Sequence, residues 1–389
     1  MFEIVDKDPS PTIIKVIGVG GAGGNAVEHM IREDVQGVEF ICVNTDGQSL
    51  KNSSAGVKLQ LGPGLGAGGK PERAREHALA ERERISEALC GAHMVFITAG
   101  MGGGTGTGAA PVIAEVAREL GILTVAVVTK PFEYEGKRMG LAEKGLAELA
   151  AHVDSLIVIL NEKLMEVLGE EVSMLEAFKS ADNVLKNAVG GIAEIINVPG
   201  LVNVDFEDVR TVMGEMGKAM MGSATAAGVD RARIAAEHAV ASPLLEGIEL
   251  SGARGVLVNI TASQSLGMKE VKDVMNTIRN YAAHDATIIF GTVFEDGMED
   301  QLRVTVVATG LGGPIVKPQA KPTISVVPGL RTGTDDRMIS DGDGSGLEAG
   351  LPAVFQSGRS GARNAAVDAM TASGVDKYDI PAFLRKQAD

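Results

Sequence analysis

The chain has 389 residues, of which 45% are hydrophobic, and a formal net charge of −15. This length is typical of about two to three domains with a large core, and the negative charge, without any basic cluster interleaved with aromatics, argues against a nucleic-acid partner. No apolar stretch approaches the roughly 18 residues that span a bilayer, and the first residues are too polar for a secretion signal. We therefore expect a cytoplasmic protein without direct membrane insertion.

Short β-branched runs alternate with helical stretches along the first part of the chain. This alternation predicts βαβ units, a mostly parallel sheet and a Rossmann-like α/β fold. The predicted strands are residues 13–19, 38–43, 94–100, 122–129 and 153–160, and the predicted helices are 25–33, 71–89 and 110–120. Cys42 and Cys90 lie in or next to apolar segments without metal-ligand spacing, so we expect buried free thiols and no metal site.

A long helical pattern from 173 to 196 is followed by Pro199 and Gly200, which end it. After a further helix at 205–213, three strand-like runs surround a helical stretch at 268–282; they are 255–262, 286–294 and 301–309. This part of the chain predicts a second, smaller α/β domain.

The composition changes beyond about residue 310. Residues 311–373 contain 5 of the 14 prolines and a single aromatic residue, which predicts a disordered linker. In the terminal stretch, Ile380, Phe383 and Leu384 have helical spacing, and Pro381 suits a first turn. A short amphipathic segment after such a linker indicates a docking peptide, although a frayed terminus is the plainer alternative.

The first two glycine-rich loops allow different interpretations. Residues 18–23 follow a predicted strand and match G-x-G-x-x-G, and Asp46 closes the next strand as a ribose-binding acid would. On these residues alone a nicotinamide-dependent oxidoreductase is a serious candidate. Residues 64–70 match G-x-x-x-x-G-K, but Pro71 stands where a P-loop needs a hydroxyl, so we interpret this match as accidental.

The third loop, GMGGGTGTGAAP at 100–111, connects a predicted strand to a helix. Its amides would lie at a helix N-terminus, where an anion is stabilised, and Thr105 and Thr107 add hydroxyl donors. A second phosphate-binding turn on a separate strand suits a nucleoside triphosphate better than a nicotinamide dinucleotide.

Asp205 and Asp208 lie three residues apart at a predicted helix start, on one face. Such carboxylates can orient a water molecule and attract cations. On the residues alone, helix capping is the better interpretation.

Seven motifs together resemble the tubulin/FtsZ family of bacterial cell-division GTPases. The resemblance covers nearly the whole chain apart from the linker, and GGGTGTG with NVDFxDV is specific to this group. The motifs are GVGGAGGNA, NTD at 44–46, GMGGGTGTGAAP, KPFEYEGKR, AFKSADNVL, NVDFEDVRTVM and DIPAFLRKQAD.

The resemblance implies a set of residues that bind GTP or GDP with Mg²⁺, held mainly by the phosphates, and K⁺ as a further candidate. It assigns the ribose to Glu135 with Arg138 nearby, and the guanine to Phe178 and Asn183; Asn183 alone would be read as an ordinary exposed helix residue. The implied binding residues are Gly20, Gly21, Ala22, Gly23, Gly24, Asn25, Asn44, Asp46, Gly102, Gly103, Gly104, Thr105, Gly106, Thr107, Gly108, Pro131, Glu135, Arg138, Asn161, Phe178 and Asn183.

The resemblance also implies that three residues are catalytic and act on GTP bound to the neighbouring subunit. They are Asn203, Asp205 and Asp208. Hydrolysis would then require head-to-tail assembly into the protofilaments of a midcell division ring. A filament scaffold with structural GTP and negligible turnover is the alternative. Further implied partners are division inhibitors and, through residues 376–389, membrane-tethered adaptors such as FtsA or ZipA.

The implied domain order has six parts. It runs from a flexible arm (1–11) through a GTP-binding domain (12–172), a central helix (173–200) and a C-terminal domain with the catalytic loop (201–310) to the linker (311–373) and the docking peptide (374–389). The chain departs from the family pattern at three places near the nucleotide. The loop at 62–70 is about three residues shorter and has Lys70 in place of Asn, the segment after Glu135 is one residue shorter, and Leu160 replaces a proline.

Overall fold

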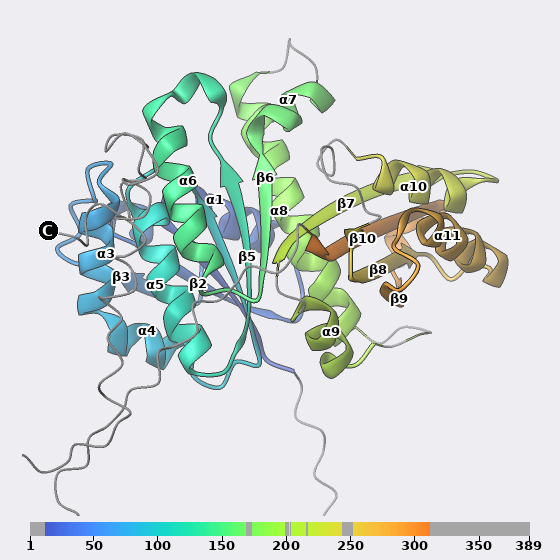
Figure 1. Cartoon of the computed structure of the whole chain (residues 1–389), viewed down its shortest axis with the longest axis horizontal. Helices are drawn as coiled ribbons and strands as arrows, with labels where there is room; N and C mark the ends of the chain where they lie inside the picture. The colour runs from blue at the N-terminus through green and yellow to red at the C-terminus, as the bar shows by residue number, and fades with distance from the viewer. Residues whose placement is uncertain are drawn as a thin grey trace, which may run out of the picture. The chain divides into compact units, whose positions relative to one another are not determined.

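The computed structural model describes residues 12–168, 173–198, 202, 204–214, 217–242 and 252–311. All of them belong to one compact unit, Met1–Gln319. The predicted N-terminal arm, the Pro199–Gly200 break, Asn203, the docking peptide and the linker from residue 312 onward lie outside these residues. Figure 1 shows the arrangement of the described elements.

A ten-stranded sheet in the order β3-β2-β1-β4-β5-β6-β7-β10-β8-β9 runs through this unit. The first seven strands in this order, from β3 through β1 to β7, pair in parallel. Strand β10 is antiparallel to β7 and β8, and β8 is parallel to β9. The strands are β1 Ile14–Val19, β2 Val38–Asn44, β3 Val57–Gln60, β4 Met94–Gly100, β5 Leu123–Lys130, β6 Ser155–Leu160, β7 Gly217–Ala227, β8 Gly255–Ala262, β9 Thr287–Phe294 and β10 Gln301–Leu311.

Helices cover both faces of the parallel part of the sheet, which explains why its strands read as continuous apolar runs. They are α1 Gly20–Arg32, α2 Gly47–Lys51, α3 Pro71–Ala80, α4 Arg82–Leu89, α5 Thr105–Glu119, α6 Lys137–Ala150, α7 Asn161–Leu168, α8 Met174–Asn197, α9 Phe206–Met213, α10 Arg231–Val240 and α11 Met268–Tyr281, with short 3₁₀ turns η1 Glu133–Glu135 and η4 Asp296–Met298. The predicted fold class is confirmed.

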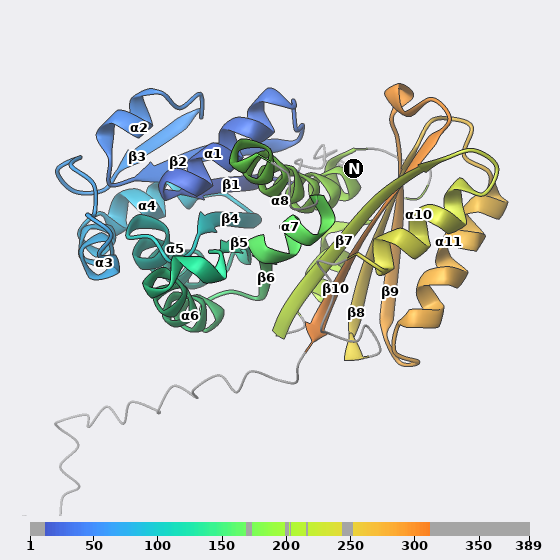
Figure 2. The same ribbon diagram turned by 90° about the horizontal axis from the view of Figure 1, so that it is seen from above.

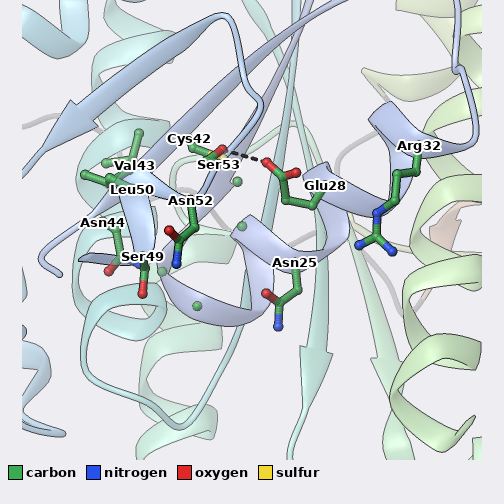
Figure 3. Close-up of a pocket in the computed structure, with 14 residues that line it drawn as sticks. Asn25, Glu28, Arg32, Cys42, Val43, Asn44, Ser49, Leu50, Asn52 and Ser53 are labelled. Atoms are coloured by element: carbon green, nitrogen blue, oxygen red, sulfur yellow. Dashed lines mark hydrogen bonds between the residues drawn. The ribbon is translucent and has the colours of Figure 1, made fainter. Parts of the chain in front are cut away.

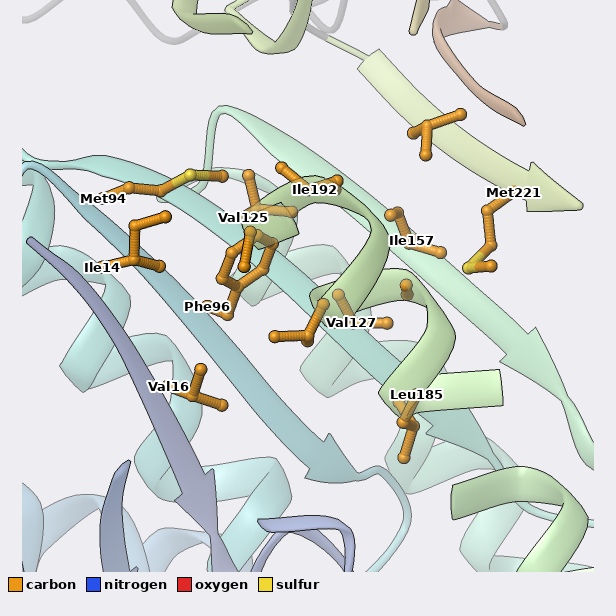
Figure 4. Packing of buried hydrophobic residues seen from close by; sticks show 14 of the residues in the cluster. Ile14, Val16, Met94, Phe96, Val125, Val127, Ile157, Leu185, Ile192 and Met221 are labelled. Carbon is orange, nitrogen blue, oxygen red and sulfur yellow. The ribbon is translucent and has the colours of Figure 1, made fainter. Parts of the chain in front are cut away.

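The central helix α8 lies between strands β1–β6 and strands β7–β10 (Figure 2). Ser173 caps it, because its hydroxyl accepts from the backbone nitrogen of Glu176 at 3.2 Å while the Glu176 carboxylate accepts from the backbone nitrogen of Ser173 at 3.1 Å. Ile192 and Leu185 of α8 pack into a buried cluster with Phe96 and Val125 from the sheet (Figure 4). One apolar face of α8 is therefore fixed against the parallel strands.

Four details differ from the sequence predictions. Helix α1 begins at Gly20, inside the first glycine run, and the predicted helix 71–89 is two helices separated at Glu81. Strands β3 and β7 and helices α6, α7 and α10 were not predicted. Cys42 is a buried free thiol as expected, but Cys90 is exposed because it follows the last residue of α4.

Candidate functional site

The two glycine-rich turns meet at the carboxyl ends of β1 and β4. Strand β1 leads directly into α1 at Gly20, which has a φ of +77°. A Cβ at Gly20 would lie 3.1 Å from the backbone nitrogen of Gly106, so a side chain there would crowd the second turn. The unpaired amides of α1 and α5 therefore face one region, where a phosphate would be stabilised.

A cavity of about 410 Å³, which we call the main cavity, opens at this junction. It brings together residues that lie far apart in the sequence, from both glycine turns and from the segments after β5, after β6 and at the start of α8. The predicted binding residues that line it are Gly21, Ala22, Gly103, Gly104, Thr105, Gly106, Pro131, Glu135, Arg138, Asn161 and Phe178.

A second cavity of about 360 Å³, the side cavity, borders the same first turn (Figure 3). The predicted residues Gly20, Gly24, Asn25 and Asn44 line it, and Gly21 lines both cavities. Within it the Glu28 carboxylate accepts a hydrogen bond of 2.8 Å from the Ser53 hydroxyl. The first glycine turn thus forms part of the wall of both spaces.

Three predicted glycines and one threonine border neither cavity and pack the turns instead. A Cβ at Gly23 would lie 2.3 Å from the carbonyl oxygen of Thr98, and one at Gly108 would lie 2.0 Å from that of Pro71. Gly102 donates its backbone N–H to the Thr107 hydroxyl at 2.9 Å. Their contacts with a nucleotide remain predictions.

Asp46 caps α2 in this structure. Its carboxylate accepts hydrogen bonds from the Ser49 hydroxyl at 2.8 Å and from the Gln48 backbone nitrogen at 2.9 Å. These bonds hold the pKa of Asp46 below its ordinary value. The residue that fits a ribose-binding acid in the sequence therefore begins a short helix.

An acidic and a basic side chain, Glu135 and Arg138, lie together at one wall of the main cavity. Glu135 and Arg138 form an ion pair, and Glu135 also accepts from the Phe132 backbone nitrogen at 3.1 Å. The Arg138 guanidinium donates to the carbonyl oxygen of Gly102 at 3.4 Å. This pair presents both hydrogen-bond acceptors and donors at the cavity wall, and its contact with a ribose stays a prediction.

An aromatic group forms another wall. The Phe178 side chain is 47% exposed, and its ring lies 6.3 Å from that of Phe132, which stacks on Tyr134 at 5.2 Å. An exposed ring inside a cavity is suited to stacking against a flat base.

Asn161 adds an unsatisfied polar group to the same cavity. The residue is only 7% exposed, and its Oδ1 has no hydrogen-bond partner among the residues that the structure describes. A buried acceptor without a partner costs free energy unless a ligand or water supplies a donor. Asn161 is therefore prepared to accept a hydrogen bond from whatever fills the cavity.

Asp182 is a site candidate that the sequence predictions missed. It follows Phe178 by four residues, which places it on the same face of α8. Burial raises the pKa of its carboxyl to about 6, although His29 and Arg32 oppose the shift. The predicted Asn183 has its Oδ1 2.7 Å from His29 Nε2, and neither Asp182 nor Asn183 lines the main or the side cavity. The i, i+4 spacing from Phe178 was the signal that could have identified Asp182.

The raised pKa of Asp182 has a measurable consequence for stability. In the folded protein this carboxyl keeps its proton up to a pH of about 6, whereas in an unfolded chain it loses it near about 4. The folded state then binds more protons in this interval, so the free energy of unfolding falls as the pH rises through it. We expect Asp182→Asn to remove this slope and to stabilise the nucleotide-free protein at pH 7.

Chemical unfolding of both proteins between pH 4.5 and 8 would measure the effect. Asp154→Asn serves as the control, and we expect it to destabilise the protein, because the Asp154 carboxylate accepts a hydrogen bond from the backbone nitrogen of Thr124 at 2.9 Å. Parallel pH curves for wild type and Asp182→Asn would contradict the expectation.

The acidic pair lies at the start of α9. The Asp205 carboxylate accepts from the backbone nitrogen of Asp208 at 2.8 Å and so caps the helix, while Asp208 is exposed. Capping and catalysis do not exclude one another here, because the Asp208 carboxylate is not used by the cap.

This pair lies near the amino ends of the parallel strands, whereas the main cavity lies at their carboxyl ends. Helix α8 starts at the cavity with Met174 and ends at Asn197, whose side chain donates to the carbonyl oxygen of Gly37, next to the amino end of β2. Its 24 residues correspond to a length of about 36 Å. Phe206, beside Asp205, contacts the ring of His93 before the amino end of β4, with ring centroids 6.1 Å apart. The acidic pair cannot reach the cavity of its own chain.

Among the residues that the structure describes, no group of three or more His, Cys, Asp or Glu side chains is arranged to hold a metal ion. Within the same residues, no helix combines the length and the apolar character that crossing a membrane requires.

Comparisons with known proteins agree with this geometry. The GTPase domain of the tubulin/FtsZ family matches residues 13–169, and the C-terminal domain of the FtsZ family matches residues 217–312. The cell division protein FtsZ of Pseudomonas aeruginosa is 54% identical, and that of Coxiella burnetii is 52% identical; the alignments cover 100% and 99% of both chains, respectively.

Two solved structures are also similar. An empty FtsZ dimer from M. jannaschii has a TM-score of 0.75 and 42% identity, covering 78% of this chain and 89% of that chain. CetZ2 from Haloferax volcanii, solved as a GTPγS-bound protofilament, has a TM-score of 0.65 at 21% identity, covering 77% and 93%, and supports the fold alone. Because relatives match from end to end at more than half identity, the chain belongs to the FtsZ family of cell-division proteins and carries its tubulin-like GTPase domain.

Proposed function

We propose that the protein is an assembly-dependent GTPase that polymerises head to tail into the protofilaments of a midcell division ring. One observation carries this proposal. The main cavity and the Asp205–Asp208 pair lie at opposite ends of the parallel strands, with the length of α8 between them. A chain built in this way holds two separated half-sites. Stacking copies in one direction brings the acidic pair of one subunit to the cavity of the next.

The cavity supports GTP in particular. The glycine turns offer backbone amides to the phosphates, Glu135 and Arg138 offer polar groups to the ribose, and Phe178 can stack on the base. We propose that Asp182, rather than the predicted Asn183, accepts from the base, because an ionised carboxylate has two acceptor oxygens for the two adjacent donors of guanine. Binding of guanine would then oppose protonation of Asp182.

Asp205, Asp208 and Asn203 would orient the attacking water, and phosphoryl transfer needs mainly such positioning and charge stabilisation. Mg²⁺ fits this arrangement as an ion held by the phosphate oxygens, because the described part of the glycine turns contributes amides and one threonine hydroxyl but no carboxylate. We propose K⁺ as a further counter-ion. When bound, these cations neutralise the phosphate charge.

The decisive experiment is phosphate release measured against protein concentration, with GTP, ATP and NADH compared and assembly followed by light scattering. We expect negligible release below a threshold concentration and a steep rise above it, with GTP alone. A rate per molecule that stays constant on dilution would contradict the half-site arrangement.

Assembly with GTP but without phosphate release would instead support a scaffold in which GTP is structural. One observation favours this second candidate: the loop at 62–70, with its changed residue Lys70, lies against the phosphate turn. A Cβ at Gly104 would be 2.9 Å from Ala67 Cβ and 3.1 Å from the backbone nitrogen of Lys70.

We further propose that residues 376–389 dock to membrane-tethered adaptors such as FtsA or ZipA, and that division inhibitors act on the assembled surfaces. The amphipathic spacing of Ile380, Phe383 and Leu384 supports the first proposal. Adaptor binding by a chain that ends at residue 375 would contradict it.

A further inference from the structure

Thr45 is buried between the two predicted binding residues Asn44 and Asp46. It is 1% exposed and follows the last residue of β2. Its hydroxyl oxygen lies 2.7 Å from that of Thr105, the first residue of α5, which lines the main cavity. Thr45 itself lines neither cavity.

We propose that Thr45 is a positioning residue that turns the Thr105 hydroxyl into a hydrogen-bond donor for a phosphate oxygen. This inference rests on the proposed binding of GTP in the main cavity. It concerns how one hydroxyl of that cavity is oriented.

The argument follows from counting hydrogens. Two hydroxyls that share one hydrogen bond have two hydrogens, so one hydrogen remains for another acceptor. If Thr105 donated, the hydrogen of Thr45 would be buried, and the described residues offer its hydroxyl no partner other than Thr105. A buried donor without an acceptor is costly. Thr45 therefore donates, and the hydrogen of Thr105 is free for a ligand in the cavity.

Backbone contacts keep Thr45 in place. Its carbonyl oxygen accepts from the backbone nitrogen of Gly66 at 2.9 Å, and Gly47 donates to the carbonyl oxygen of Gly64, also at 2.9 Å. The side chain is β-branched, so few rotamers are open to it. A fixed backbone and a restricted χ1 together hold the hydroxyl beside Thr105.

The orientation of the Thr105 hydroxyl matters because the expected ligand group, a phosphate, is charged. Hydrogen bonds to charged groups are stronger than those between neutral groups. A hydroxyl that already points its hydrogen into the cavity need not reorient when a phosphate arrives. We therefore expect Thr45 to matter for nucleotides with phosphates and not for the nucleoside.

The test compares GTP and guanosine binding by calorimetry, below the assembly threshold, for wild type and three substitutions at position 45. Thr45→Val keeps the shape but removes the hydroxyl, and we expect it to weaken GTP binding about tenfold while guanosine binding is unchanged. Thr45→Ser restores a hydroxyl and should return most of the affinity. Thr45→Ala removes the hydroxyl without an added methyl and serves if the valine variant does not fold.

Thr98→Val is the matched control. Thr98 of β4 is also a fully buried threonine, but its hydroxyl has no hydrogen-bond partner within the described part of the chain, so its removal should leave GTP binding unchanged. In addition, Thr45→Val should have no further effect in a Thr105→Val background, because both changes remove the same interaction.

The outcomes separate this inference from the proposed function. A wild-type protein that does not prefer GTP over guanosine would overturn the proposed function itself. If the wild type shows the preference, the inference is overturned by a Thr45→Val protein with normal GTP affinity, by an equal loss for GTP and guanosine, or by a serine variant that does not recover.

Discussion

Asp208→Asn is expected to bind GTP with wild-type affinity but to release phosphate at least about 10²-fold more slowly. Its carboxylate is exposed and is not used by the helix cap, which Asp205 makes to the backbone of residue 208. The asparagine keeps the size and the backbone bond, so α9 should form as before. What it loses is the negative charge that we propose orients the attacking water. Calorimetric GTP binding and phosphate release above the assembly threshold measure the two effects separately.

Glu207→Gln is the matched control for this substitution. Glu207 neighbours Asp208 on the same helix turn, is exposed and pairs with Arg210 at 3.6 Å, a surface contact of small energetic weight. We expect it to hydrolyse GTP within about threefold of the wild-type rate, since such pairs contribute little. Equal losses for both variants would indicate a general effect of charge on assembly rather than a role for Asp208.

A mixing experiment tests whether the two half-sites belong to different molecules. The Asp208→Asn protein has an intact cavity, and a cavity-defective variant has an intact acidic pair. If catalysis occurs between subunits, the mixture should release phosphate although neither protein does so alone. If each chain hydrolyses its own GTP, the mixture should remain inactive.

The sequence predicted the parts of this fold that local patterns determine. Helix α8 was found within one residue of its observed ends because a Ser173–Glu176 capping box and a long apolar face define it. The two glycine-rich turns that line the cavities were found because glycine runs follow β-branched strands. These signals lie within about twenty residues of sequence.

Features that depend on long-range pairing were missed. Strand β7, with the sequence GKAMMGSATAA, has almost no β-branched residues, and its strand conformation comes from pairing with β6 and β10. The same holds for the site: Thr45 gains its role only through contact with Thr105, which is 60 positions away. Asp182 was passed over because burial, which raises its pKa, is not visible in the sequence.

Gly106→Ala is expected to weaken GTP binding about tenfold or more. The added Cβ would lie 2.5 Å from the carbonyl oxygen of Gly100 and 3.4 Å from Ala99 Cβ, and the carbonyl belongs to a backbone that cannot rotate away. Overpacking of this kind costs about 1–3 kcal/mol, and each 1.4 kcal/mol corresponds to about a tenfold change in affinity. The first turn of α5 must shift to relieve the clash, and its amides then leave the position that suits a phosphate.

Gly140→Ala separates this local effect from the general effect of an alanine in a helix. Gly140 lies in α6, where a Cβ would meet no atom within 4 Å. There we expect unchanged GTP binding and slightly higher stability, because glycine is a poor helix former.

Calorimetric titration of the Gly106→Ala protein with GTP and with guanosine shows which part of the ligand loses affinity. A loss for GTP that exceeds the loss for guanosine assigns Gly106 to the phosphate end of the cavity, whereas equal losses, or normal binding, would remove that turn from the phosphate site. In the mixing experiment, Gly106→Ala is then the cavity-defective partner, used at a GTP concentration that fills only Asp208→Asn.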